Sequence, residues 1–288
     1  MSIVTRFAPS PTGFLHLGHA YAALIAFLRA REAGGQLLLR IEDIDPARCQ
    51  PRYAAAIEED LRWLGITWDG PVRVQSAHLA EYRAALAALA ARGLVYPCFC
   101  TRADIVREIA RSAAAPHAPD GGAVYPGTCR ALPGKLRAKR VAAGEPHALR
   151  LDMNAALRAV PAQLTFVEEG EGEIVCDPAP FGDVVLARKD APASYHLCVT
   201  RDDAIQGVTL VTRGVDLKPA THLHRLLQAL MGWPAPMYAH HRLIVDAAGQ
   251  RFAKRNAAVT LRAMRERGMS PAEVRALSGF GDQWGMPG

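Results

Sequence analysis

Two histidines near the N-terminus have the type and spacing to handle nucleotide phosphates. The segment Phe7-Ala8-Pro9-Ser10-Pro11-Thr12-Gly13 breaks an apolar strand, and His16-Leu17-Gly18-His19 follows at once. A helix that starts after such a turn offers backbone N–H groups and the positive end of its dipole to an anion. His16 and His19 can donate hydrogen bonds to a triphosphate and to the charge that develops as an α-phosphate is attacked. Capping of the helix is the alternative role for either histidine, but the position after the turn favours ATP binding.

Acidic side chains follow the next predicted strand. Glu42 and Asp43 come at its C-terminal end, where open α/β sheets place their ligands. A carboxylate at this position can hold an ammonium group. For Asp43 and Asp45 a helix cap or an ion pair with Arg48 is the favoured interpretation. Glu42 is therefore the candidate for a ligand contact.

Three cysteines in the middle of the chain have the chemistry of a metal site. Cys98-Phe99-Cys100 and the later Cys129 would supply three soft thiolates, and one further ligand would complete a closed tetrahedral zinc site. The alternative is a set of three reduced, buried thiols. The fourth ligand is open at this point, and His117 is the usual chemical choice. One structural Zn²⁺ per chain is the resulting expectation.

A basic cluster follows the last of these cysteines. It could track RNA phosphates, or it could be the solvent-facing side of a helix. Its members are Arg130, Lys135, Arg137, Lys139 and Arg140.

Alternating strands and helices, predicted from the sequence, must position these residues. Apolar residues at helical spacing and β-branched runs, separated by glycine and proline, predict a βαβ rhythm and a parallel sheet. Residues from about 96 to 185 interrupt this rhythm, which predicts an insertion into a Rossmann-like domain. The expected strands are Ile3–Phe7, Leu37–Ile41, Ala204–Arg213 and Arg242–Val245, and the expected helices are Leu17–Ala33, Tyr53–Leu64, Leu79–Arg92, Thr221–Leu230, Leu261–Arg267 and Pro271–Leu277.

Length and composition set the class of protein. A chain of 288 residues with 50% apolar content can bury a large core. No apolar run reaches the roughly 20 residues of a membrane-spanning helix, and no signal-peptide pattern is present. Six cysteines in a chain of this length predict reduced thiols or metal ligands. We expect a cytoplasmic monomer without a membrane partner, and a formal net charge of +6 permits a polyanionic partner such as tRNA.

The N-terminal motif resembles that of the class I aminoacyl-tRNA synthetases. The run R-F-A-P-S-P-T-G-F-L-H-L-G-H, Arg6 to His19, is similar to the glutamyl branch in particular. The resemblance continues through L-R-I-E-D-I-D-P from Leu39 to Pro46 and through V-T-R-G-V-D from Val211 to Asp216. It ends in a degenerate form of the family's K-M-S-K-S loop, which reads R-F-A-K-R from Arg251 to Arg255.

The resemblance implies a fold and a division of the chain. The expected fold class is α/β, a Rossmann-like class I catalytic core with a zinc-bearing insertion and a short C-terminal helical stem, without an anticodon-binding domain. The expected segments are the first half of the core at 1–95, the acceptor-binding-like insertion with the zinc site at 96–185, the second half of the core at 186–245, and the loop and stem at 246–288.

The resemblance also implies roles for individual residues. Glu42 would bind the α-amino group of L-glutamate, and planar arginines would hold its two carboxylates. In the loop, Lys254 keeps a lysine that contacts the ATP phosphates, although a serine of the pattern has become Ala253. The implied glutamate contacts are Arg6, Ser10, Glu42, Tyr195 and Arg213, and the implied catalytic and ATP-binding residues are His16, His19 and Lys254.

A Tyr-x-x-x-Cys pattern bears on the zinc ligands. Zinc-bearing members of the subfamily resembled here carry this pattern, and Tyr125 to Cys129 reproduces it. The expected ligand set is therefore Cys98, Cys100, Tyr125 and Cys129, with His117 kept as the alternative fourth ligand.

The prediction of the substrate depends on the short C-terminal segment. Only 34 residues follow Lys254, and the chain resembles the truncated glutamyl-queuosine tRNA(Asp) synthetases. That family implies tRNA-independent activation of glutamate with ATP and Mg²⁺, followed by transfer to the queuosine cyclopentenediol in the anticodon of tRNA(Asp). Two alternatives stay open: a truncated glutamyl enzyme that charges the 3′ end of tRNA(Glu), and a zinc-bearing tRNA-binding module without catalysis.

Overall fold

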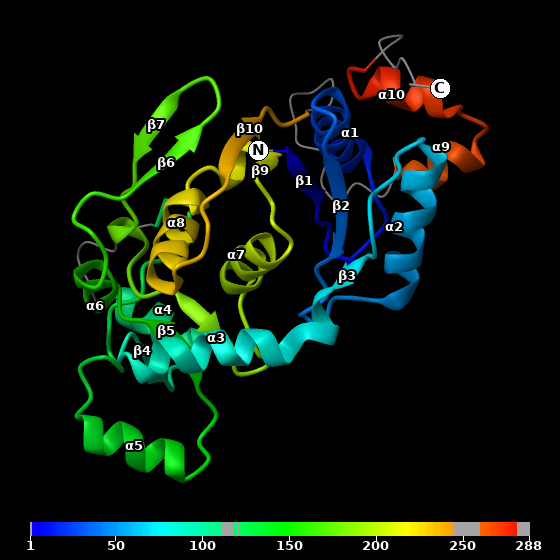
Figure 1. Ribbon diagram of the computed structural model, residues 1–288. Coiled ribbons are helices and arrows are strands. Elements are labelled where there is room, and N and C mark those ends of the chain that lie inside the picture. Colours follow the sequence, from blue (N-terminus) through cyan, green and yellow to red (C-terminus); the bar gives the residue numbers. More distant parts are fainter. Residues whose placement is uncertain (1, 111–117, 120, 245–259, 281–288) are drawn as a thin grey trace. The chain divides into compact units, whose positions relative to one another are not determined.

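A computed structural model describes residues 2–110, 118–119, 121–244 and 260–280 (Figure 1). The chain divides into two compact units, each assembled from separate stretches of sequence. The first comprises Met1–Ala77, Gly207–Val215 and Pro236–Gly288, and the second comprises His78–Gln206 and Asp216–Ala235. None of the helices among the described residues is both long enough and apolar enough to cross a membrane.

The first unit is built on parallel strands with helices between them. Strand β1 pairs in parallel with β2, β2 pairs in parallel with β3, and β9 pairs in parallel with β10. The strands are β1 (Val4–Phe7), β2 (Gln36–Ile41), β3 (Arg73–Val74), β9 (Leu210–Gly214) and β10 (Met237–His241), and the helices are α1 (Leu17–Glu32), α2 (Pro51–Trp63), α9 (Leu261–Glu266) and α10 (Pro271–Leu277).

Strand β9 lies beside β1, on the opposite side from β2. The Thr209 N–H donates to the Val4 carbonyl at 3.0 Å, and the Val4 N–H donates to the Thr209 hydroxyl at 2.9 Å. The strands of this unit therefore lie in the order β3, β2, β1, β9, β10. From β1 the chain adds β2 and β3 on one side, and it later adds β9 and β10 on the other side, so the strand order reverses between β1 and β9. Open α/β sheets bind their ligands at such a switch point, outside the carboxyl ends of the strands.

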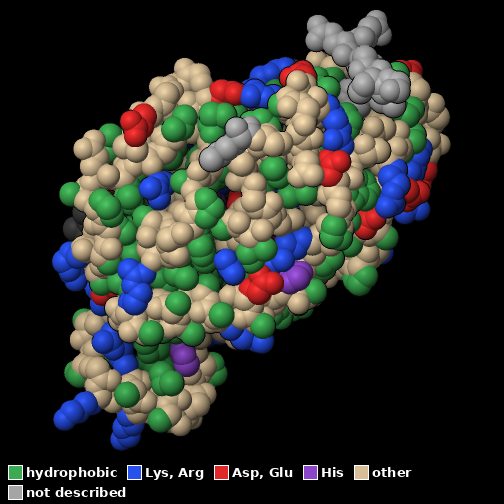
Figure 2. Space-filling model, viewed as in Figure 1, with side chains coloured by type: hydrophobic (Ala, Val, Ile, Leu, Met, Phe, Trp, Pro, Cys, Tyr) green, Lys and Arg blue, Asp and Glu red, His purple; other side chains and the backbone are tan. Residues whose placement is uncertain are grey.

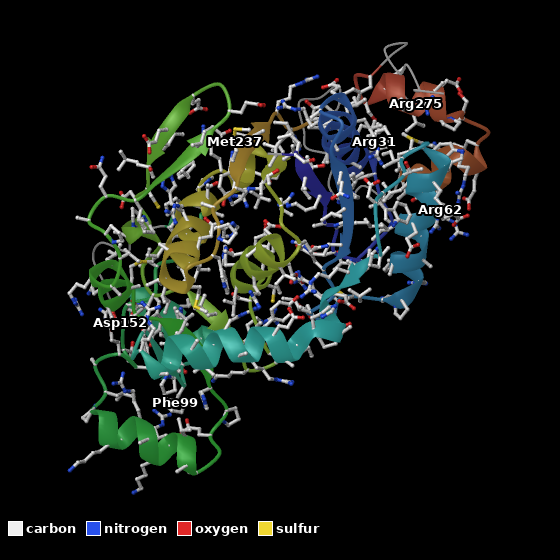
Figure 3. The ribbon with its side chains drawn as sticks, in the orientation of Figure 1. Arg31, Arg62, Phe99, Asp152, Met237 and Arg275 are labelled. Atoms are coloured by element: carbon white, nitrogen blue, oxygen red, sulfur yellow. The ribbon has the colours of Figure 1, made fainter. Side chains whose placement is uncertain are left out.

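The core of this unit follows from continuous apolar strands and an alanine-rich helix. Leu37, Leu39 and Ile41, which share one face of β2, are nearly fully buried, and Arg40 on the opposite face is buried as well. Helix α1 contributes small buried residues such as Ala20 and Ala23, and α9 and α10 add side chains to the same core. Arg275 of α10, labelled in Figure 3, donates to the Leu64 carbonyl at 3.0 Å, which ties the C-terminal helices to the end of α2.

Glycine at one position makes the α1–β2 connection possible. A Cβ on Gly35 would lie 2.0 Å from the Ile3 carbonyl oxygen, so only glycine lets the start of β2 reach the edge of β1.

The second unit combines antiparallel strands with helices. Strand β5 pairs antiparallel with both β4 and β8, and β6 and β7 form an antiparallel hairpin. Asp152, labelled in Figure 3, caps α6 by accepting from the Ala155 N–H at 2.9 Å. The strands are β4 (Val95–Cys98), β5 (Ala148–Leu151), β6 (Thr165–Glu168), β7 (Gly172–Val175) and β8 (Val185–Ala187), and the helices are α3 (Leu79–Ala91), α4 (Arg102–Ala110), α5 (Gly134–Ala142), α6 (Met153–Arg158), α7 (Tyr195–Ile205) and α8 (Ala220–Met231). Short 3₁₀ helices complete the two units: η1 (Gln75–His78), η2 (Ala179–Phe181) and η3 (Val215–Leu217).

Most expected elements are confirmed, but one strand prediction is wrong in extent and another is wrong in place. The segment expected as a strand from Ala204 begins as the end of helix α7, and β9 starts only at Leu210. The strand expected from Arg242 is not found at residues 242–244, because β10 comes earlier in the chain and ends at His241. Val245 lies outside the described residues. Helix α7 carries buried residues in a nearly continuous run, Leu197 to Thr200, so it has no apolar stripe that would identify a helix.

Candidate active site and cysteine cluster

The two histidines lie at the N-terminus of α1 and cap it reciprocally. His16 is the N-cap residue, and its Nδ1 accepts from the Gly18 N–H at 3.1 Å. The His16 N–H donates in turn to Nδ1 of His19 at 3.2 Å, and the two ring centroids are 3.8 Å apart. A Cβ on Gly18 would lie 3.1 Å from Cε1 of His16, so glycine leaves the room that this ring position needs.

Capping decides which ring nitrogen of each histidine carries the proton. A nitrogen that accepts a hydrogen bond is unprotonated, and neutral imidazole then carries its proton on the other nitrogen. His16 and His19 both accept at Nδ1, so both neutral rings offer Nε2–H as a donor. The structure therefore shows the capping role, and the same geometry orients two donors at a helix terminus that favours anions.

The turn after β1 and the end of β2 are hydrogen-bonded to each other. The Glu42 N–H donates to the Pro9 carbonyl at 3.1 Å, and the Gln50 N–H donates to the Pro11 carbonyl at 3.0 Å. Glu42 is buried, with 7% of its surface exposed, and it lies at the carboxyl end of β2. These bonds hold Glu42 beside the proline-rich turn that leads to the two histidines.

A buried arginine that the sequence analysis missed accompanies Glu42. Arg40 has no exposed surface, and its Nη1 lies 3.7 Å from Oε1 of Glu42. Residues two apart on a strand point to the same face, so an arginine inside the apolar run Leu37–Ile41, two positions before Glu42, is a signal that could have been used. The Arg40 guanidinium is therefore an ion-pair partner of the buried Glu42 carboxyl group.

Arg6 and Arg213 are both buried and both lie in the first unit, 5% and 6% exposed. Nη1 of Arg6, on β1, donates to the Thr212 carbonyl at 3.0 Å, which brings it to β9. Nε of Arg213, on β9, donates to Nε2 of His240 at 3.1 Å, and its guanidinium lies 5.3 Å from the centre of the Tyr238 ring. The two arginines therefore come from the adjacent strands that flank the switch point.

The other predicted contacts lie in different surroundings. Ser10 is exposed in the turn after β1. Tyr195 is the first residue of α7 in the second unit, and its ring centroid lies 5.8 Å from that of the buried His224. Lys254 lies outside the described residues. Thr260, six positions after Lys254, forms an antiparallel bridge with His16, so the chain re-enters the described structure beside the capped helix end.

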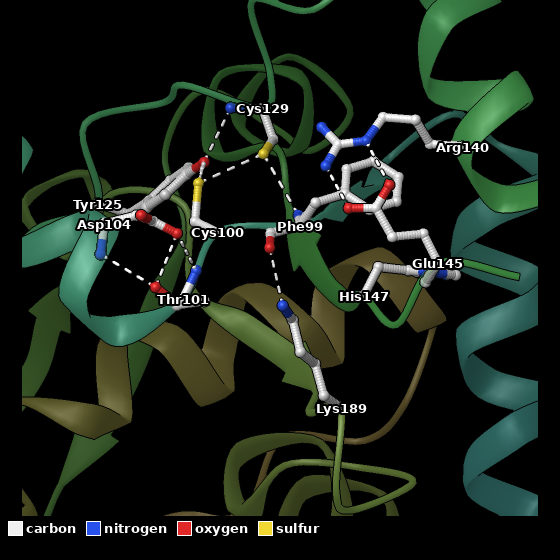
Figure 4. A network of polar contacts seen from close by, with 10 residues as sticks. All are labelled: Phe99, Cys100, Thr101, Asp104, Tyr125, Cys129, Arg140, Glu145, His147 and Lys189. Atoms are coloured by element: carbon white, nitrogen blue, oxygen red, sulfur yellow. Dashed lines mark hydrogen bonds and ion pairs between the residues drawn. The ribbon is translucent and has the colours of Figure 1, made fainter.

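The three cysteines form one cluster in the second unit (Figure 4). The sulfur atoms of Cys98, Cys100 and Cys129 all lie within 4.8 Å of one another, and Cys100 Sγ is 3.4 Å from Cys129 Sγ. The Tyr125 hydroxyl is 3.4 Å from Cys100 Sγ and accepts from the Cys129 N–H at 2.8 Å. Four atoms bound tetrahedrally to one ion at about 2.3 Å would be about 3.8 Å apart. The cluster therefore could hold a metal ion.

Burial and hydrogen bonding set the protonation of the cluster. Burial raises the pKa of the Cys100 thiol to about 11. Burial also opposes ionisation of Cys129, but hydrogen bonds from Tyr125 and from the Phe99 N–H outweigh it and lower the pKa of this thiol. Burial, followed by hydrogen bonds to the thiols, raises the pKa of the Tyr125 phenol. Of Cys100 and Cys129, Cys129 therefore ionises first. His117, the alternative fourth ligand, lies outside the described residues.

A second buried polar network supports this region, and the sequence analysis did not identify it. The Asp183 carboxylate accepts from Nη1 of Arg130 at 3.0 Å and from the Tyr96 hydroxyl at 2.5 Å. It also accepts from the Met153 N–H at 3.0 Å. Strand β4, which ends at Cys98, is thereby joined to the segment that follows Cys129.

Comparison with known proteins identifies the family. A family model described as the catalytic domain of class I tRNA synthetases (E and Q) matches residues 2–281. The chain therefore belongs to this family of ligases, and its α/β fold is the Rossmann-like catalytic domain of class I.

Two relatives are similar over nearly their whole length. The Glutamyl-Q tRNA(Asp) synthetase of Rhodobacter capsulatus is 53% identical over 284 residues, which cover 96% of this chain and 100% of the relative. The protein of the same name from Nocardia farcinica is 46% identical over 284 residues, which cover 98% of this chain and 85% of the relative.

A solved structure shares the fold. The glutamate tRNA ligase of Elizabethkingia meningosepticum, crystallised in complex with its amino acid, superimposes with a TM-score of 0.74 at 28% identity. The match covers 89% of this chain and 53% of the ligase, so the chain spans about half the length of that protein.

Proposed function

We propose that this enzyme activates L-glutamate with ATP, without needing tRNA, and transfers the glutamyl group to the queuosine cyclopentenediol in the anticodon of tRNA(Asp). The main support is the arrangement at the carboxyl edge of the first unit, where Glu42, two buried arginines and the capped histidine pair lie on adjacent elements. The names of the relatives in R. capsulatus and N. farcinica support the same tRNA.

Glutamate would bind through its charged groups. The Glu42 carboxylate would accept from the α-ammonium group, and Arg40 is its ion-pair partner at 3.7 Å. Arg6 and Arg213 would hold the carboxylates, because a planar guanidinium can form two parallel hydrogen bonds with such a group. Ser10 and Tyr195 are proposed as further contacts.

In the first step an oxygen of the glutamate α-carboxylate attacks the α-phosphorus of ATP. A new oxygen–phosphorus bond forms, the bond to the β-phosphate oxygen breaks, and pyrophosphate leaves. Nε2–H of His16 and of His19 would donate to the phosphate oxygens, and Lys254 would add positive charge in the transition state. When bound with ATP, Mg²⁺ would neutralise phosphate charge.

In the second step a hydroxyl oxygen of the cyclopentenediol attacks the activated carbonyl carbon of glutamyl-adenylate. The new ester bond replaces the bond to the AMP phosphate, AMP leaves, and the hydroxyl proton is released. The product is an ester of glutamate on the modified base.

A structural Zn²⁺ is the proposed occupant of the cysteine cluster. Three sulfur atoms and a phenol oxygen at these distances suit a closed site for this ion, and bound Zn²⁺ would favour the charged form of each ligand. The proposed ligands are Cys98, Cys100, Tyr125 and Cys129, one ion per chain.

The deciding experiment is transfer of labelled glutamate, with ATP and Mg²⁺, to purified tRNAs. The tRNAs are tRNA(Asp) with queuosine, tRNA(Asp) without queuosine, and tRNA(Glu). Labelling only of the first supports the proposal. Labelling of tRNA(Glu) at its 3′ end would refute the proposal in favour of the charging reaction. Pyrophosphate exchange without labelling of any tRNA would support the activation step and refute the transfer step.

The division of the chain into four segments, the cytoplasmic location and the monomeric state stay predictions. Gel filtration with light scattering of the purified chain tests the last of these directly.

A further inference from the structure

Helix α5 carries an unusual amount of charge for a helix of its length. None of its nine residues is buried, and two of its apolar side chains, Leu136 and Val141, are 42% and 40% exposed. Four of the nine residues are cationic and none is acidic: Lys135, Arg137, Lys139 and Arg140. A surface helix usually packs an apolar face against the core of its domain. Helix α5 has no such buried face, so other contacts must hold it to the second unit.

The two arginines attach α5 to the unit by stacking on aromatic rings. The Arg140 guanidinium lies 4.0 Å from the centre of the Phe99 ring, and its Nε donates to Glu145 at 2.7 Å (Figure 4). The Arg137 guanidinium lies 5.8 Å from the centre of the Tyr96 ring. Phe99 stands between two cysteines of the cluster, and its N–H donates to Cys129 Sγ at 3.3 Å. Helix α5 is thus anchored to the same strand end that carries the cysteine cluster.

The two lysines point their charge outward. Lys135 and Lys139 are exposed and lie four residues apart, on one face of the helix. Neither has a hydrogen-bond or ion-pair partner among the residues that the structure describes. In Figure 2 blue side chains project into solvent where Figure 1 shows α5. We call Lys135 and Lys139 the α5 surface.

We propose that the α5 surface binds the phosphate backbone of the tRNA substrate. The inference rests on the proposed function for the presence of a tRNA, and it adds where and by which chemistry that tRNA is held. Exposed ammonium groups attract phosphates as point charges, and counterions are released from the nucleic acid on binding. Phosphate contacts carry no sequence information, so the α5 surface would contribute affinity and orientation rather than sequence preference.

A double variant, Lys135→Ala with Lys139→Ala, tests the proposal. The matched control is Arg83→Ala with Arg158→Ala, which removes two exposed cations of the same unit that also have no described partner. Binding of tRNA(Asp) with queuosine is measured by fluorescence anisotropy between 50 and 300 mM KCl. Glutamate-dependent pyrophosphate exchange without tRNA and the thermal unfolding midpoint are measured for every protein.

The logarithm of the association constant falls as the logarithm of the salt concentration rises. Loss of two phosphate contacts should make this slope less negative by about 1.5 and should weaken binding near 0.15 M salt roughly tenfold. The control variant should keep the wild-type slope, and pyrophosphate exchange should stay unchanged in both variants. An unchanged slope in the α5 variant, or an equal decrease in the control, would overturn the inference. Absence of exchange in the wild type would instead overturn the proposed activation, while the salt slopes would still decide the role of α5.

Discussion

A buried carboxylate on helix α2 gives a sharp test of the electrostatics of this fold. Asp60 has no exposed surface, and neither of its carboxylate oxygens has a hydrogen-bond partner among the residues that the structure describes. Arg265 of α9 is a neighbouring cation, with Nη1 4.0 Å from Oδ1. Burial raises the pKa of Asp60 from 3.8 to about 6, because the attraction of Arg265 does not make up for the lost hydration.

The magnitude follows from the difference between the folded and the unfolded pKa. A group whose pKa is raised in the folded state binds its proton more tightly there, so folding is favoured at low pH and this contribution is lost as the pH rises from about 4 to about 6. At 1.36 kcal/mol per pKa unit, the ionised carboxylate should cost about 3 kcal/mol of unfolding free energy at pH 7.5 and about 1 kcal/mol at pH 4.5.

The substitution Asp60→Asn removes the charge while keeping the shape and polarity of the protonated side chain. We expect it to raise the free energy of opening of α2 by about 3 kcal/mol at pH 7.5 and by about 1 kcal/mol at pH 4.5. Hydrogen exchange of peptides that cover Pro51–Trp63, corrected for the intrinsic rate at each pH, measures this quantity. A local readout is suitable because two units need not unfold in one step.

The matched control is Glu59→Gln. Glu59 is the preceding residue, and its carboxylate is 2.9 Å from Nη2 of the same Arg265, but it is 59% exposed. An exposed ion pair contributes about 1 kcal/mol or less, so this variant should change the opening energy little and without the same pH dependence. Equal effects of Asp60→Asn at the two pH values, or reduced protection at pH 7.5, would refute the reasoning.

Three further predictions concern the proposed reaction and its metal. Lys254→Ala should abolish glutamate-dependent pyrophosphate exchange and leave the unfolding midpoint unchanged, and near-normal exchange would contradict the role of this lysine. Tyr125→Phe should lower bound zinc, measured by mass spectrometry of the metal, below one ion per chain; full zinc content would transfer the fourth position to His117. Arg40→Met should raise the KM for glutamate roughly tenfold or more, because it removes the guanidinium that lies 3.7 Å from the buried Glu42 carboxylate, whereas Arg40→Lys should restore much of the loss. A KM close to the wild-type value in Arg40→Met would argue against this explanation.

Much of the fold could be read from local patterns. The expected helices after the proline-rich turn and at the C-terminus match α1, α9 and α10 within one residue or so at each end. The sequence patterns do not predict helix α7, and its residues Ala204 and Ile205 fall within an expected strand. The physical reason is burial on several sides: the Tyr82 hydroxyl, a single donor, lies 2.9 Å from both carboxylate oxygens of Asp202 inside this helix, so a polar residue occupies a core position and breaks the periodic signal.

The sequence by itself determined which residues could do chemistry. The strand-breaking turn before His16-x-x-His19 and the closely spaced Cys98 and Cys100 are recognised from residues that are neighbours along the chain. Tertiary structure alone decided what depends on packing between distant segments. It put Thr260 beside His16, brought Cys129 to Cys100, stacked Arg140 on the Phe99 ring and buried the Asp60 carboxylate without a hydrogen bond from any described residue. Side-chain charge and spacing are local properties, whereas burial and ion pairing are set only when the elements pack.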